Sequence, residues 1–294
     1  MRAQVTTHHY AKEKILTGLL ILLLITSSCK QKHTNFSTRS VNDKRCLELY
    51  PLDTRPLIED NRIQVENAYS IVFPEKGCLP HELEHELIQL IFSNTTANTI
   101  EEAAEQFLNH TGLEGYDELT DKSRKIKRID SITVTSYNYT RITGTCDRDD
   151  NLVTFSVYTE MYMAGAPHGY HITDMLTIDL NTRRIIHLED LIDTTRLGEV
   201  LIRALEDVAV NREEGYTTDC LNGEYKEKLP MPDCFFIDSS RSVITAIYNI
   251  YSVQPYYCDM LFVKMPVFWL SKHIPLTPYA KQLFGPEAYL PDDR

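Results

Sequence analysis

The sequence predicts an α+β protein with largely antiparallel sheets, packed helices and two sequential lobes. Strand-like segments occur in runs interrupted by helices, without the regular βαβ alternation of a parallel sheet. Residues 170–180 show the strand pattern, because Ile172, Leu176 and Ile178 alternate with polar side chains. Residues 195–211 show the helix pattern, with leucines spaced to occupy one face.

Local signals predict the other elements in order. Thr99-Ile100-Glu101-Glu102 is a capping box, so a helix begins there and ends before Gly112. Beta-branched and aromatic residues fill 129–145, and the acidic turn 147–151 separates this strand from its partner. We expect further strands at 63–73, 152–163, 235–237, 243–248 and 260–265, a short strand ending at 187, and helices at 80–93 and 188–193.

The first 29 residues have the composition of an export signal. Basic residues precede an apolar run from Ile15 to Ile25, and small residues lead into Cys29. A cysteine directly after the cleavage position is typical of a bacterial lipoprotein, in which it carries the lipid. The apolar run is shorter than the roughly 20 residues of a membrane span. We expect residues 1–28 to be a lipoprotein signal peptide and Cys29 to be lipidated.

The predicted location is the bacterial cell envelope, where the lipid is the only membrane anchor. Lys30 follows the lipidated position and does not supply the Asp associated with inner-membrane retention. We therefore expect an outer-membrane lipoprotein facing the periplasm. Residues 29–45 are polar and almost free of apolar anchors, which predicts a disordered tether.

The charge balance is strongly acidic. The full chain has a net charge of −12, and loss of residues 1–28 removes three basic residues and one acidic residue, which leaves −14. A surface of this sign argues against nucleic acid and against binding to anionic lipids through basic patches. It favours cationic partners.

Seven cysteines are present, and six remain once Cys29 is assigned to the lipid. An oxidising compartment permits three disulfides among six cysteines, and none of them has zinc-site spacing. We predict that Cys220 pairs with Cys234, because this disulfide would close the loop 221–233, which looks otherwise unsupported. The second predicted pair is Cys46–Cys78, and Cys146–Cys258 follows by elimination.

His81-Glu82-Leu83-Glu84-His85 fits the H-E-x-x-H pattern of zinc hydrolases, with Glu102 or Glu105 available as a third ligand. The apolar stripe of this helix contains Leu83, Leu87, Leu90 and Ile91, so the histidines fall on the opposite, solvated face. We therefore favour a solvated helix face over a zinc hydrolase that uses His81, His85 and Glu105.

Other catalytic patterns are missing from the sequence. The acidic turn 147–151 lacks the glycine and glutamate of a calcium loop, so we interpret it as a hairpin tip. There is no G-x-S-x-G elbow, phosphate loop or dinucleotide fingerprint. We expect no catalytic residue and no cofactor.

The turn between two predicted strands, residues 162–170, places small residues around His168. Small residues imply a close backbone approach and an unusual turn. Two interpretations remain: a structural corner in which His168 bonds the backbone, which we favour, and a ligand or partner contact at the end of the sheet.

Five segments of the chain form a recurring order of motifs: Gly165-Ala166-Pro167-His168-Gly169 and residues 176–180, 186–191, 246–256 and 265–270. In this order they resemble the RsiV/PdaC-type family of extracytoplasmic bacterial domains, found in a lysozyme-sensing anti-sigma factor and beside a peptidoglycan deacetylase domain. The chain departs from the family pattern at Ala164, Arg183-Arg184 and Cys258-Asp259. The resemblance implies an N-terminal PdaC-like α+β module at 46–160, a C-terminal RsiV-like α+β module at 161–275 and a C-terminal tail at 276–294.

These observations predict a non-enzymatic envelope lipoprotein whose ectodomain binds an envelope protein, such as a lysozyme-like enzyme, or a peptidoglycan fragment. The alternatives are the zinc hydrolase and a purely structural envelope component. Function depends on sites and not on folds, so this inference is one of analogy. Exposed aromatic side chains are typical binding anchors. The candidate binding residues are His168, Tyr170, Tyr248, Tyr251 and Tyr256.

Overall fold

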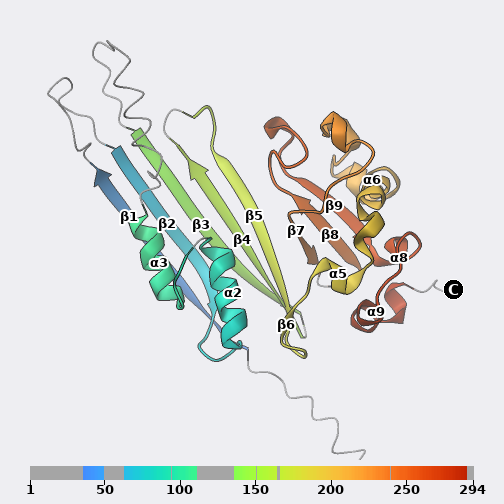
Figure 1. Cartoon of the computed structure of the whole chain (residues 1–294), viewed down its shortest axis with the longest axis horizontal. Coiled ribbons are helices and arrows are strands. Elements are labelled where there is room, and N and C mark those ends of the chain that lie inside the picture. The colour runs from blue at the N-terminus through green and yellow to red at the C-terminus, as the bar shows by residue number, and fades with distance from the viewer. Residues whose placement is uncertain are drawn as a thin grey trace, which may run out of the picture. The chain divides into compact units, whose positions relative to one another are not determined.

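Two β-sheets and the helices packed on them make up the part of the chain that the structure describes (Figure 1). The computed structural model describes residues 36–49, 63–93, 95–110, 136–149, 151–163, 166–238 and 240–289. The predicted signal peptide, Cys29 and the first part of the predicted tether lie outside these ranges. No helix within them has the length and apolar composition to cross a membrane.

The first sheet has six strands in chain order within the described residues. All its pairs are antiparallel except the parallel pair β2–β3, so the largely antiparallel α+β class is confirmed. The helices α2 (His81–Ile91) and α3 (Ile100–Asn109) connect that parallel pair. The strands are β1 (Thr38–Leu49), β2 (Ile63–Pro74), β3 (Ser136–Asp149), β4 (Leu152–Tyr162), β5 (Tyr170–Asp179) and β6 (Arg184–Ile185).

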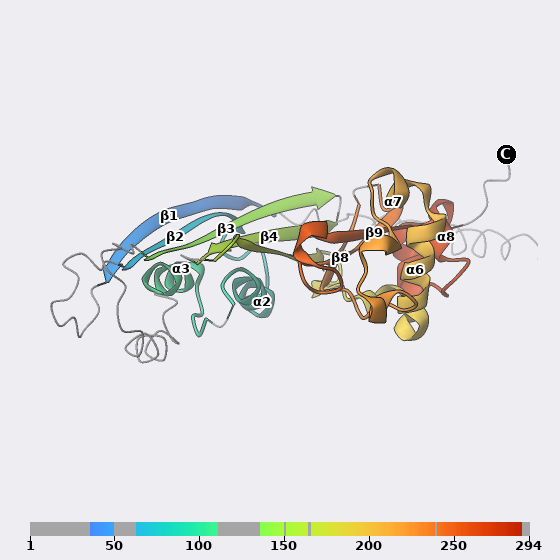
Figure 2. The same cartoon turned by 90° about the horizontal axis from the view of Figure 1, so that it is seen from above.

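Helices α2 and α3 cover one face of this sheet (Figure 2). Alternation along β4 places Val153, Phe155 and Val157 on the covered face, where they join the leucines and isoleucines of α2 in one core. The predicted cap of α3 is present, since the side chain of Thr99 accepts a hydrogen bond from the Glu102 N–H. The other face of the sheet has mainly polar side chains.

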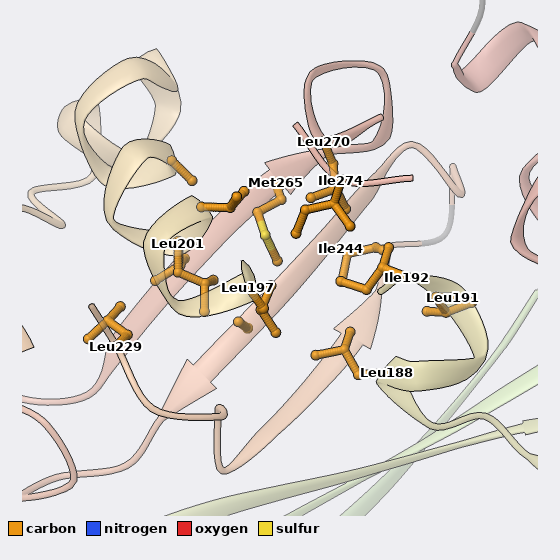
Figure 3. Close-up of a cluster of buried hydrophobic side chains, with 14 of the residues drawn as sticks. Leu188, Leu191, Ile192, Leu197, Leu201, Leu229, Ile244, Met265, Leu270 and Ile274 are labelled. Carbon is orange, nitrogen blue, oxygen red and sulfur yellow. The ribbon is translucent and has the colours of Figure 1, made fainter. Parts of the chain in front are cut away.

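The second sheet consists of β7 (Cys234–Ile237), β8 (Val243–Tyr248) and β9 (Leu261–Pro266), all antiparallel. Leu197 and Leu201 of α6 pack against Ile244 and Met265 in its core (Figure 3). These leucines lie on the apolar face that the sequence predicts. The helices of this part are α5 (Leu188–Leu191), α6 (Leu197–Asp207), α7 (Ala209–Glu213), α8 (Val267–Leu270) and α9 (Pro278–Phe284).

The predicted helix 195–211 is interrupted at Val208, which has an extended conformation between α6 and α7. Asn211 explains the break, because its fully buried side chain donates to the carbonyl oxygens of Ala204 and Lys264. The same amide accepts the Lys264 N–H. The side chain thus joins the helix end to β9, which a continuous helix would not allow.

The predicted tether is wrong over its second part, since Thr38–Leu49 forms β1 and pairs with β2 along its whole length. Strand β1 is polar because it lies at an edge of the sheet and only side chains such as Val41 reach the core. Its backbone hydrogen bonds and the ion pairs from Arg39 and Arg45 to α3 hold it in place.

The described part of the predicted C-terminal tail 276–294 contains a helix and packs into the core of the second sheet. Leu276 bridges to Ile192, and α9 buries Ala280 and Phe284. Thr277 caps this helix and Pro278 occupies its first turn. The predicted module boundary after residue 160 does not separate the two sheets either, because β5 and β6 pair within the first.

The observed disulfide joins Cys220 to Cys258, with 6.2 Å between their Cα atoms, so none of the predicted pairs forms. The Asn222 N–H donates to the Val253 carbonyl and brings the short turn of Cys220 beside the loop that ends at Cys258. Cys234 begins β7 instead, where its Sγ donates to the Thr173 carbonyl at 3.3 Å.

The other predicted pairs fail for reasons of strand position. Cys46 is exposed in β1 opposite Glu66, whereas Cys78 follows the far end of β2 and accepts the Ser37 N–H. Cys146 lies half-buried within β3, and burial raises the pKa of its thiol to about 11.

Candidate binding site

Three of the five predicted binding residues meet in one cluster, here called the aromatic site: His168, Tyr251 and Tyr256. The imidazole of His168 stacks on the ring of Tyr256 with 3.6 Å between centroids and 13° between planes. Tyr251 lies beside both, with its hydroxyl 3.1 Å from His168 Nε2 and its ring 5.8 Å from that of Tyr256. The turn before β5 and the loop between β8 and β9 thus supply one surface.

The hydrogen bonds of His168 define its neutral form. Its Nδ1 lies 2.9 Å from the Gly169 carbonyl oxygen, which only accepts, so Nδ1 carries the proton. In the neutral ring Nε2 is then an acceptor, and the Tyr251 hydroxyl donates to it. The backbone bond that the structural interpretation of His168 expected is present, and the ligand or partner contact stays a prediction.

Buried amide side chains fix the loop that carries the two tyrosines. Asn249 Oδ1 accepts the Thr173 N–H at 2.7 Å and its Nδ2 donates to the Thr173 carbonyl at 3.1 Å, which ties the loop to the edge of β5. Asp233 accepts the Asn249 N–H and the Ser252 hydroxyl, each at 2.6 Å. Asn249 and Gln254 are buried polar groups, and such groups are stable only when bonded in this way.

The end of the same loop is held by a second set of bonds. Gln254 Nε2 donates to the carbonyl oxygens of Cys258 and Asp259, at 3.0 and 2.9 Å. The disulfide of Cys258 anchors this segment to Cys220. Tyr256 therefore stands on backbone that is fixed on both sides.

Two residues of the loop have left-handed backbone conformations, Tyr251 with φ of 68° and Asp259 with φ of 62°. A positive φ is uncommon outside glycine because it costs conformational energy. The side chain of a bulky aromatic residue makes no local hydrogen bond that would offset this energy. The surrounding bonds must hold Tyr251 in this conformation, which turns its ring towards His168. Such strained residues often occur at binding sites.

The aromatic site continues into a second group of rings and charges. His171 stacks on Tyr158 with 5.7 Å between centroids, and its Nε2 lies 3.1 Å from Asp259 Oδ1. Burial, followed by the charges of Glu160 and Asp259, raises the pKa of Tyr158. Tyr257, which follows Tyr256 in the chain, is 84% exposed.

Sequence reasoning missed Tyr158, His171, Tyr257 and Asp259. His171 is one of the polar side chains that alternate with the apolar ones along β5, but only its tertiary contact with Asp259 gives it a place in the site.

The other two predicted residues do not join the cluster. Tyr170 is exposed at the start of β5 and has no described ring contact with the three. Tyr248 is a correction: it is fully buried, its hydroxyl donates to the Pro230 carbonyl at 2.6 Å, and burial strongly raises its pKa. Tyr248 belongs to β8, the central strand of its sheet, and the core around this strand covers its side chain. The sequence of the segment alone does not show whether such a side chain is buried or exposed.

The alternative zinc residues do not converge on a third ligand. Glu105 forms a two-pronged ion pair with Arg45, at 2.9 and 3.1 Å. Glu102 accepts the Asn98 N–H. In the described residues no group of three or more His, Cys, Asp or Glu side chains is placed to hold a metal ion.

His81 and His85 lie on α2 as the sequence expects, but with different exposure. His81 is exposed, whereas His85 is half-buried and its Nδ1 has no hydrogen-bond partner. The buried stripe of the helix contains Leu83, Leu87 and Ile91, as predicted.

Comparison with known proteins identifies the architecture. No family model matches the chain, and no curated protein matches it. A crystal structure of a DUF3298 family member from Bacteroides fragilis NCTC 9343 matches with a TM-score of 0.59 and 21% identity, over 84% of this chain and 96% of the other. The two proteins share a fold. A DUF3298 protein from Pseudomonas aeruginosa PAO1 matches with a TM-score of 0.49 and 12% identity, over 84% and 97% of the two chains.

At this level of identity the comparison shows the fold alone. DUF3298 is a family of unknown function, so these structures assign neither a ligand nor a reaction to the aromatic site.

Proposed function

We propose that this chain is a non-enzymatic lipoprotein of the bacterial cell envelope, of the RsiV/PdaC type, whose ectodomain binds a partner through the aromatic site. The lipid on Cys29 is its anchor, and the outer membrane facing the periplasm is its location. The partner is an envelope protein of the lysozyme-like, cationic kind or a fragment of peptidoglycan.

The observation that carries the proposal is the stacked group of His168, Tyr251 and Tyr256, presented on backbone fixed by buried amides and a disulfide. Rigid tyrosine rings supply a large contact area at a low cost in conformational entropy. Tyr251 is 51% exposed and Tyr257 84% exposed, so ring surface is available to a partner. Both apolar contact and hydroxyl hydrogen bonds are possible there.

The net charge supports a cationic protein as the first partner to test. A strongly acidic domain attracts a basic protein at long range and accelerates its association. Asp259 and Glu160 add negative charge close to the aromatic site.

The test uses the chain without residues 1–28 and with Cys29→Ala, titrated with a lysozyme and separately with soluble muropeptides. We expect one of the two to bind with a Kd in the micromolar range or below. Tyr251→Ala and Tyr256→Ala each weaken that binding about tenfold or more, the usual effect of an anchor residue. Phe268→Ala, which removes an exposed aromatic ring on α8, leaves it unchanged.

Two results would contradict the proposal. One is the absence of binding to either probe at high micromolar concentration. The other is a similar loss from Phe268→Ala and from the two tyrosine variants, because the aromatic site would then have no special part.

A further inference from the structure

A groove of about 610 Å³ lies between the two helices of the first sheet and the face that they cover. Its floor is formed by Ile142 of β3, Met161 of β4 and Ile172 of β5, and its helical wall includes Phe92 and Phe107. Phe92 follows the last turn of α2 and packs on Phe107 of α3, 5.4 Å between centroids, so the two rings close one side. Its lining has polar side chains such as Asn67 and Gln106 beside the apolar ones, and its size is typical of a site for a small organic molecule.

Among the polar groups of this lining one is a carboxylate. Asp174 of β5 stands on the same face as the core residues Leu176 and Ile178, opposite Val157 of β4, and it lines the groove. Among the described residues it has no hydrogen-bond or ion-pair partner. A carboxylate among apolar side chains is costly unless a cation or several donors compensate it.

The neighbours of Asp174 add negative charge. Burial and the charge of Asp233 raise the pKa of Asp174. Asp233 itself is compensated, because it accepts hydrogen bonds from Asn249 and Ser252. The electrostatic environment at this end of the groove therefore favours a bound positive charge.

We propose that this groove binds an apolar molecule that carries one cationic group, with a primary alkylamine as the simplest case. The ammonium group pairs with the Asp174 carboxylate, and the apolar body lies over Met161 and Ile172 beneath Phe107. This site goes beyond the proposed function, since it uses no residue of the aromatic site and is a second, small-molecule site.

Three probes with the same alkyl chain test the proposal: octylamine, 1-octanol and octanoate. Calorimetric titration of the chain without residues 1–28, carrying Cys29→Ala, should show octylamine binding about tenfold tighter than 1-octanol, the effect of one partly buried charge pair. Octanoate should bind most weakly of the three, because its negatively charged carboxylate would be repelled by the carboxylate of Asp174.

Two variants locate the site. Asp174→Asn should bring the amine to the affinity of the alcohol and leave the alcohol unchanged, whereas Asp147→Asn, on the opposite face of the sheet, should preserve the preference. Thr159→Phe fills the groove from β4 and should weaken all three probes. Thermal unfolding confirms that each variant is folded.

Equal affinity of the unmodified chain for the amine and the alcohol would overturn the proposal, as would a preference that survives Asp174→Asn. Absence of binding by all three probes would overturn it too. If Asp174→Asn does not fold, the difference between the amine and alcohol affinities of the unmodified chain still tests the role of charge. The Thr159→Phe variant then tests whether the probes bind in this groove.

Discussion

The imidazole of His168 and the phenol ring of Tyr256 stack face to face, 3.6 Å between centroids, although one belongs to the first sheet's hairpin and the other to the second sheet's loop. The contact joins the edge of β5 to the β8–β9 connection. It depends on side-chain bonds that span the same junction, chiefly those of Asn249 with Thr173.

The stacking can be detected without a ligand. Tyr256→Leu removes the ring current over His168, so the imidazole proton resonances should move downfield in the proton NMR spectrum. Tyr251→Phe keeps the stack and removes only the hydroxyl donor, so a smaller change is expected. Tyr257→Leu is the matched control, because that ring is 84% exposed and has no described ring contact with His168. An unchanged His168 spectrum in Tyr256→Leu would show that the rings do not stack in solution.

Asn249→Ala should lower the free energy of unfolding by about 2–4 kcal/mol, because it leaves the Thr173 N–H and carbonyl without their partners. Urea unfolding measures the loss. Asn42→Ala, at an exposed position of β1, should change stability by less than about 0.5 kcal/mol. Equal effects of the two substitutions would mean that the bonds of Asn249 do not hold the two sheets together.

Removal of the disulfide with Cys220→Ser and Cys258→Ser should cost about 3–4 kcal/mol, since it releases a loop of 38 residues in sequence separation. The melting temperature of the double variant, compared with that of Cys46→Ser, checks this. Cys46 is exposed in β1 and forms no disulfide, so its replacement should leave the melting temperature unchanged. A stable double variant would indicate that the hydrogen bonds of Gln254 suffice to hold the loop.

The cysteine thiols should differ in their reactivity towards alkylating reagents at pH 8. Burial, with the charges of Asp174 and Asp233, raises the pKa of Cys234 to about 12, so almost none of it is thiolate. Only the thiolate reacts, which makes Cys234 slow and the exposed Cys46 fast. Mass spectrometry of peptides after timed alkylation distinguishes them, and unfolding in urea should equalise the rates. Fast labelling of Cys234 in the folded protein would contradict its placement at the junction.

His85→Leu should raise the free energy of unfolding by about 1 kcal/mol, because it replaces a buried nitrogen that has no partner in the structure with an apolar side chain. His81→Leu, at the exposed end of the same helix, is the control and should have little effect. A loss of stability from His85→Leu would point to a partner of Nδ1 that the described contacts do not include.

Several predictions followed correctly from local patterns. The alternation in β5 and the capping box before α3 identified elements that the structure contains. The edge strand β1 was assigned to a tether, because an edge strand is stabilised by backbone pairing and long-range ion pairs and needs few apolar residues of its own. Helix α9 was likewise assigned to a tail, although its Thr-Pro start was readable.

The α+β class, most strand and helix positions, and the aromatic candidates His168, Tyr251 and Tyr256 could all be predicted from the amino-acid sequence. The folded structure was needed to show which of the candidates meet, that Tyr248 is buried, and that Cys220 pairs with Cys258. The physical reason is range: periodicity and capping depend on neighbours within a few residues, whereas ring stacking, burial and disulfide pairing depend on segments that folding brings together from distant parts of the chain.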